Sequence, residues 1–97
     1  MIIGVARFSI FIPGAQSLKD KRHVMKAIIN QVQHRFNVAI AEVDGHDQWQ
    51  AAELGVVCIS TSADHADAML QEVAQFIERR LVDGYVADVH TELIPMG

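Results

Sequence analysis

Hydrophobic residues along the chain change from a short period to a helical period, which predicts strands and helices in succession. The first apolar run, residues 2–12, is rich in β-branched and aromatic residues and stops at Pro13 and Gly14, which predicts a strand followed by a turn. From Leu18 to Phe36 the apolar residues recur every three or four positions. This spacing predicts a helix of about 18 residues with one buried stripe.

The rest of the chain repeats this pattern with short connections. A second helix is predicted to begin at Ser62 or Asp64, because apolar residues again recur at helical spacing as far as Leu81, and Gly84 follows as a helix end. Three further strands are predicted, at residues 38–43, 53–60 and 85–94.

The predicted order of elements is therefore strand, helix, strand, strand, helix, strand. Two split right-handed β-α-β units of this kind form a ferredoxin-like α+β sandwich, with a four-stranded antiparallel sheet and both helices on one face. The length of 97 residues corresponds to one domain, residues 1–97.

Strand alternation predicts which side chains lie on the sheet face that carries no helix. The first and last strands are neighbours in this fold, so Arg7 should share the open face with Asp88, His90 and Glu92. A cross-strand ion pair from Arg7 to Asp88 or Glu92 is expected. The residues of the first strand expected to face the helices are Gly4, Ala6, Phe8, Ile10 and Ile12.

The open sheet face is also predicted to carry an apolar patch. Small domains usually cover such a patch, so we expect a homo-oligomer formed through this face. The apolar residues expected there are Val5, Phe11, Val86 and Ile94, with either Val56 or Val57 from the third strand.

Charge is distributed unevenly along the chain. Residues 1–35 hold six of the eight basic residues and only one acidic residue, Asp20, so their net charge is +5. The whole chain carries −4, which leaves −9 on residues 36–97. A basic region on an acidic molecule indicates a localised anion site or a self-complementary oligomer, and argues against a protein that coats nucleic acid with its whole surface.

The most basic segment is residues 17–26, at the start of the first predicted helix. Ser17 is the expected N-cap, and Asp20 completes a capping box three residues later. The cations of this segment therefore crowd the helix end that already carries positive partial charge, which favours an external anion or an acidic partner. The predicted anion-binding or nucleic-acid-binding residues are Lys19, Lys21, Arg22 and Lys26.

These four cations divide on a helical wheel. Lys19, Arg22 and Lys26 form one strip, whereas Lys21 lies at the opposite edge of the buried stripe. In the functional interpretation the strip contacts phosphates or an acidic surface. The alternative is a solvated flank that is neutralised by the acidic remainder of the molecule.

The loop after the second predicted strand offers two further candidates. Asp44, His46 and Asp47 could donate to a divalent metal, but their spacing matches no diagnostic motif, and Asp and Gly are common in turns for backbone reasons. We therefore predict no metal site. Trp49, the only tryptophan, is either a contact for a partner or a cover for the end of the sheet.

No motif in the sequence indicates an enzyme. Cys58 lies in an apolar strand, where a free cysteine behaves as a small hydrophobe, and His90 has no nucleophile near it in the sequence pattern. The chain contains no Gly-rich phosphate loop, Cys-x-x-Cys or His-Glu-x-x-His string. We expect no catalytic residues and no cofactor.

The sequence also predicts a soluble cytoplasmic protein without membrane contact. The N-terminal apolar run is interrupted by Arg7 and Ser9, so it does not resemble a signal peptide, and no stretch reaches the roughly 20 apolar residues of a membrane span. The single cysteine cannot form an internal disulfide.

Several segments of the chain resemble the YlxP-like family of small bacterial proteins of unknown function. The resemblance covers nearly the whole chain. It is carried by the strings IPGAQSLKDKR at residues 12–22, RFNV at 35–38, AEVD at 41–44, and WQ at 49–50 followed by AELG at 52–55.

This resemblance implies a ferredoxin-like fold and no known activity. Members of the family tend to carry another basic residue in place of His23 and more often Glu in place of Asp20, so this chain has less charge in the segment, because histidine is mostly neutral at pH 7. Genes of the family typically accompany translation factors, which implies a role linked to RNA or the ribosome. We expect a non-enzymatic binding protein for RNA or a ribosomal surface; the alternative is a structural or regulatory oligomerising module without a nucleic-acid ligand.

Overall fold

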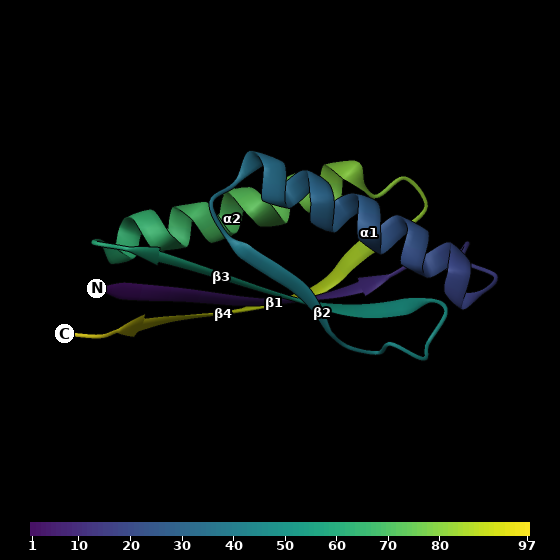
Figure 1. Cartoon of the computed structure of the whole chain (residues 1–97), viewed down its shortest axis with the longest axis horizontal. Coiled ribbons are helices and arrows are strands. Elements are labelled where there is room, and N and C mark those ends of the chain that lie inside the picture. Colours follow the sequence, from purple (N-terminus) through teal and green to yellow (C-terminus); the bar gives the residue numbers. More distant parts are fainter.

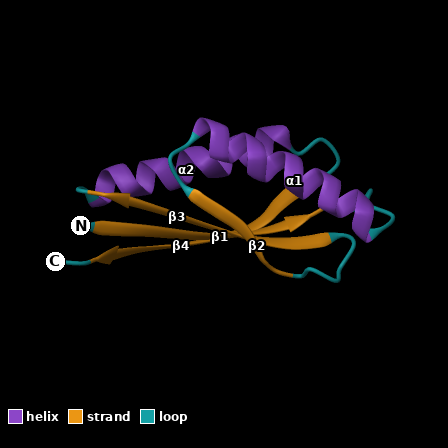
Figure 2. Ribbon diagram, in the orientation of Figure 1, coloured by secondary structure: helices purple, strands orange, loops and turns teal.

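The computed structural model describes all of residues 1–97 and has the predicted order of elements (Figure 1). The four strands form one antiparallel sheet in the order β2-β3-β1-β4. Both helices cover the same face of this sheet and the other face is open, which confirms the ferredoxin-like α+β sandwich (Figure 2). The elements are β1 (Ile2–Phe11), α1 (Leu18–Arg35), β2 (Ala39–Asp44), β3 (Ala51–Ser60), α2 (Ala63–Arg80) and β4 (Tyr85–Pro95).

Both helices begin at the serines that the sequence suggests as N-caps. Ser17 Oγ accepts a hydrogen bond from the backbone N–H of Asp20 at 3.1 Å, and Ser62 Oγ accepts one from His65 at 3.1 Å. Each cap satisfies a backbone donor that has no partner within the helix. The starts of α1 and α2 are thus fixed locally, by residues next to them in the sequence.

The hydrophobic core lies between the helices and the inner face of the sheet. In β1, Ala6, Phe8 and Ile10 alternate inward and are almost fully buried, as predicted. In β3 the register is settled in favour of Val56, which is buried, whereas Val57 lies on the open face. α2 packs mainly over β1, β3 and β4, and α1 lies over β2.

A β-bulge in β4 corrects the predicted face of Val86. Ser9 pairs with Asp88 but Ile10 pairs with Val86, so Ala87 is an extra residue between them. Val86 therefore faces the helices and packs against the core. Tyr85 takes the open-face position instead, opposite Phe11, and the centroids of the two rings are 5.8 Å apart.

Arg7 lies on the open face as predicted, but its predicted ion-pair partners were wrong. Its guanidinium turns towards β3 and β2, where Nε is 3.1 Å from Glu53 Oε2 and Nη2 is 3.4 Å from Asp44 Oδ2. Glu53 is held in place because its other carboxylate oxygen accepts a hydrogen bond from Ser9 Oγ at 2.7 Å. On the β4 side, the residue opposite Arg7 is His90, which offers no carboxylate.

Neither helix has the length and apolar composition that would let it cross a membrane.

Candidate anion-binding surface

The first turn of α1 positions the basic segment. Asp20 Oδ2 accepts a hydrogen bond from the backbone N–H of Gln16 at 3.0 Å, while Ser17 caps Asp20 in return. The two side chains thus form a reciprocal cap, as the sequence predicts, although Asp20 binds the residue before the N-cap. The carboxylate of Asp20 is directed at the backbone, and it forms no ion pair with a neighbouring lysine.

Lys21 does not belong to the surface, so its place among the predicted anion-binding residues is corrected. Its side chain is fully buried, and Nζ lies 3.0 Å from Glu42 Oε2 on β2. The same ammonium donates hydrogen bonds to the backbone carbonyls of Gly45 and Ala51. The contact with Glu42 is a close charge contact rather than an aligned hydrogen bond.

The position of Lys21 has a sequence signal that helical periodicity alone does not interpret. Lys21, Met25 and Ile28 follow one another at intervals of four and three, so Lys21 belongs to the buried stripe of α1. On β2, Ile40 and Glu42 alternate inward. An inward lysine on a helix and an inward glutamate on the strand below it are candidates for a buried pair.

The remaining three predicted residues, Lys19, Arg22 and Lys26, are exposed and form no ion pair. We call these three residues the α1 strip. Lys26 and Arg35 are nine residues apart, about 2.5 helical turns, so they point to opposite sides of α1. Arg35 contacts Phe76 of α2. The α1 strip therefore faces away from α2.

Charge separates between the two layers of the molecule. Only Arg7 and Lys21 among the eight basic residues form ion pairs with carboxylates. The six unpaired cations all lie on the helices, namely Lys19, Arg22, Lys26, Arg35, Arg79 and Arg80. The open sheet face carries Asp44, Glu53, Asp88 and Glu92, with Arg7 as its only lysine or arginine.

Trp49 lies in the short loop between β2 and β3 and is 54% exposed. Together with Phe11 it lines a shallow hollow of about 470 Å³. The loop is anchored on both sides of the tryptophan, because Lys21 binds the carbonyl of Gly45 and the side chain of Gln50 donates to the carbonyl of Pro13 at 3.0 Å. Trp49 is thus an exposed aromatic ring on a fixed loop, and its contact with a partner stays a prediction.

The other polar candidates do not come together as a site. His90 Nε2 is 3.2 Å from Glu92 Oε1 in a largely exposed pair. Asp44 accepts a hydrogen bond from the N–H of Gly45 at 2.8 Å and contacts Arg7. No three His, Cys, Asp or Glu side chains gather where they could hold a metal ion.

Cys58 is buried on the inner face of β3. Burial raises the pKa of its thiol, and a hydrogen bond with the backbone of Gly4 partly offsets this. The thiolate is the reactive form of cysteine, so this environment disfavours nucleophilic chemistry.

Comparisons with known proteins identify the family and the fold. Residues 3–91 match a family described as "Protein of unknown function (DUF503)". The chain is 40% identical over 77 residues to "Uncharacterized protein YlxP" of Bacillus subtilis strain 168, an alignment that covers 79% of this chain and 84% of that protein.

Two designed proteins of solved structure share the fold. One is described as the de novo designed LFR1 1 with ferredoxin fold; it has a TM-score of 0.58 at 15% identity, and the match covers 97% of this chain and 84% of that one. The de novo designed Foldit4 has a TM-score of 0.54 at 10% identity over the full length of both chains. These similarities concern the fold alone, whereas the sequence match extends over most of the chain. The protein therefore belongs to the YlxP-like DUF503 family of proteins of unknown function.

Proposed function

We propose that the protein is a non-enzymatic binding protein that holds the phosphate backbone of RNA, free or on a ribosomal surface, against the α1 strip. The observation that carries this proposal is the set of three exposed cations, Lys19, Arg22 and Lys26, which have no carboxylate partner on a molecule of net charge −4. Carboxylates elsewhere in the chain could neutralise these cations, but none lies close enough to do so.

The chemistry of the α1 strip suits a phosphate backbone. Two lysines act as mobile point charges, and the guanidinium of Arg22 can donate to two phosphate oxygens at once. Contacts of this kind position nucleic acid without reading its sequence. The strip follows one flank of a rigid helix, so its three cations are held in line.

The open sheet face is a poor alternative surface for RNA. Modules that bind RNA on a sheet need aromatic residues on which bases stack. Here Phe11 and Tyr85 lie at one end of the face, and the carboxylates of Glu53, Asp88 and Glu92 occupy the strands beyond them. These carboxylates would repel phosphates, which leaves the helical layer as the favoured side.

The test replaces the α1 strip with glutamine, as Lys19→Gln, Arg22→Gln and Lys26→Gln together. Single-stranded RNA binding would be followed by fluorescence anisotropy over a salt series, and ribosome binding by co-sedimentation. Release of counterions from three phosphate contacts gives a slope of roughly −2 in log K against log salt for the unaltered protein. The triple variant should lose most of this affinity and most of this slope.

A charge-matched control separates the α1 strip from overall charge. Thr61→Glu, Ala63→Glu and Ala68→Glu together change the net charge by the same −3 at exposed positions around the start of α2. This control should bind RNA much more strongly than the strip variant. Equal binding of the strip variant and the unaltered protein, to both RNA and ribosomes, would refute the proposal.

A second candidate function is a structural or regulatory module that forms an oligomer and binds no nucleic acid. It is favoured by a shallow groove of about 430 Å³ on the open face, across β1, β3 and β2. Eight of the ten residues that line the groove are hydrophobic, including Val5, Val43 and Val57. If α1 itself served the oligomer interface, the strip variant would change the mass measured by light scattering, and neither form would bind RNA.

A further inference from the structure

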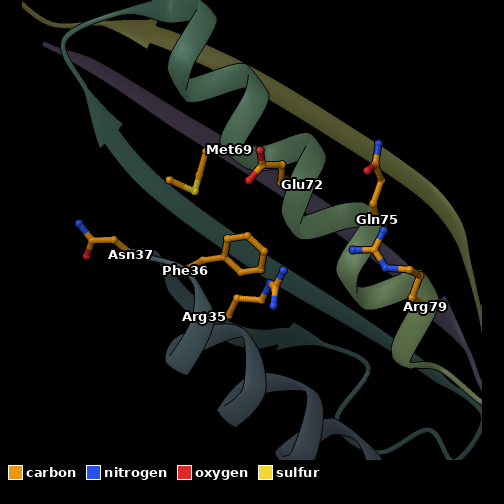
Figure 3. A pocket seen from close by; sticks show the side chains of 7 residues that line it. All are labelled: Arg35, Phe36, Asn37, Met69, Glu72, Gln75 and Arg79. Atoms are coloured by element: carbon orange, nitrogen blue, oxygen red, sulfur yellow. The ribbon is translucent and has the colours of Figure 1, made fainter.

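The groove between the two helices contains cations that the proposed function does not use. It has a volume of about 480 Å³ and lies between the end of α1 and the second half of α2. The residues that line it are Arg35, Phe36, Asn37, Met69, Glu72, Gln75 and Arg79 (Figure 3). Its volume is within the range of about 300–1,000 Å³ that is usual for small-ligand sites.

Arg35 is held in this groove by aromatic rings. Its guanidinium carbon lies 5.4 Å from the centre of the Phe76 ring and 5.8 Å from that of Phe36. The two rings pack edge to face, with centroids 5.6 Å apart. Cation–π contacts with two packed rings restrict the side chain before any ligand binds, while its N–H donors remain free.

Arg79 enters the same groove from the opposite helix. Figure 3 shows the two guanidinium groups extending from α1 and α2 into the space between the helices. Neither Arg35 nor Arg79 forms an ion pair, although Glu72 lines the same groove. Two like charges directed into one space repel each other, and an anion placed between them would relieve this repulsion.

Helix dipoles explain only part of this arrangement. Both arginines lie in the last turn of their helices, where a cation interacts favourably with the negative end of the dipole. That interaction is satisfied by any cation near the helix end. It does not require two guanidinium groups to extend into one groove, and it leaves their hydrogen-bond donors without acceptors.

We propose that this groove binds a phosphomonoester, with the phosphate between Arg35 and Arg79. A phosphate dianion neutralises both guanidinium groups and can accept hydrogen bonds from both sides, whereas a planar carboxylate presents one edge and one charge. The amides of Asn37 and Gln75 offer further donors. Glu72 disfavours a second phosphate and can accept a hydrogen bond from a hydroxyl or amino group on the rest of the ligand.

Two sources could supply this phosphate, a free nucleoside monophosphate or the 5′-phosphorylated end of an RNA. The inference does not rest on the proposed contact with the RNA backbone, because the α1 strip lies on the opposite flank of α1 from Arg35. A small phosphomonoester could occupy the groove whether or not RNA binds the strip, so each proposal can fail without the other.

The test measures binding of adenosine 5′-monophosphate and inorganic phosphate by heteronuclear NMR, with titration up to about 10 mM, which would detect even a millimolar dissociation constant. We expect shifts centred on residues that line the groove. Arg79→Gln should weaken binding of adenosine 5′-monophosphate about tenfold, the effect of losing one charged hydrogen-bonding group. Arg79 makes no hydrogen bond or ion pair with the rest of the protein, so this variant should fold.

Matched variants make the result specific. Arg22→Gln removes the same charge from the α1 strip and should change binding less than twofold. Arg79→Lys keeps the charge but not the planar fork of donors, so it should fall between Arg79→Gln and the unaltered protein. A pair of otherwise identical oligoribonucleotides, with and without a 5′-phosphate, distinguishes the sources: preference for the phosphorylated one that depends on Arg79 assigns the RNA end, and its absence assigns the free nucleotide.

Either of two results would overturn the inference. The first is no binding of any phosphate probe at the groove. The second is equal weakening of adenosine 5′-monophosphate binding by Arg79→Gln and Arg22→Gln, which would mean general charge attraction. A loss of thermal stability in Arg79→Gln without a loss of binding would assign Arg79 to the helix end alone.

Discussion

At the scale of single residues, Lys21 changes the interpretation of the basic segment most. Four cations follow one another closely in the sequence, but one of them is an internal tether and three are solvent-exposed. The ammonium of Lys21 holds Glu42 and two backbone carbonyls at the ends of β2 and β3. An ammonium has three donors, and here each has a partner within reach.

Replacement of Lys21 with methionine should therefore destabilise the protein by about 3–5 kcal/mol, because the carboxylate of Glu42 would stay buried without its partner charge. Chemical denaturation followed by circular dichroism measures this free energy of unfolding. The double variant Lys21→Met, Glu42→Leu should recover much of the loss, since it buries no charge. A loss below about 1 kcal/mol in Lys21→Met, typical of a surface ion pair, would show that water solvates Glu42.

At the scale of elements, α1 and α2 were predictable because their signals are local. Ser17 and Ser62 cap helices that the sequence places within one or two residues, and the apolar spacing defines the buried stripe of each. The strands were predictable in number and order but less so in detail. A single extra residue, Ala87, reverses which face the following side chains occupy, and β alternation read from one strand cannot show it.

The β-bulge makes a prediction about Val86. Since its side chain faces the helices and is partly buried against the core, Val86→Ala should destabilise the protein by about 1 kcal/mol through the loss of buried methyl groups. Thermal unfolding measures the change. Ala87→Ser, at the exposed extra position, should stay within about 0.5 kcal/mol of the unaltered protein. If the two variants were equally stable, Val86 would lie on the open face after all.

At the scale of the whole molecule, the two layers carry different chemistry. The helical layer holds every unpaired lysine and arginine, and the open sheet face combines carboxylates with an apolar groove. Opposite charges on opposite sides allow one copy to attract another, while the apolar groove offers area to bury. The predicted homo-oligomer through the open face thus has a defined surface to be tested.

Val57→Lys places a charge in that apolar groove, at a position 39% exposed on the open face. If the face joins two copies, the variant should have the mass of a monomer by light scattering at concentrations where the unaltered protein has a higher mass. Gln71→Lys, on the exposed surface of α2, adds the same charge away from the sheet and should leave the mass unchanged. A monomeric unaltered protein at all concentrations tested would exclude the oligomer.

The candidate site was only partly predictable from sequence. The α1 strip followed from helical spacing, because Lys19, Arg22 and Lys26 lie within two turns of one helix. The groove between the helices did not, since Arg35 and Arg79 are 44 positions apart and meet only when α1 packs against α2. No spacing rule connects residues at that separation.

The sequence by itself determined the order of elements, the inward stripe of each helix, the faces of β1 and the excess of cations near the N-terminus, because periodicity, capping and composition are local properties of the chain. Only the tertiary structure decided that Lys21 is buried, that Arg7 pairs across β3 and β2, and that Val86 turns inward. Each of these depends on which groups from distant segments meet, and on whether a buried charge or an apolar side chain finds a partner there.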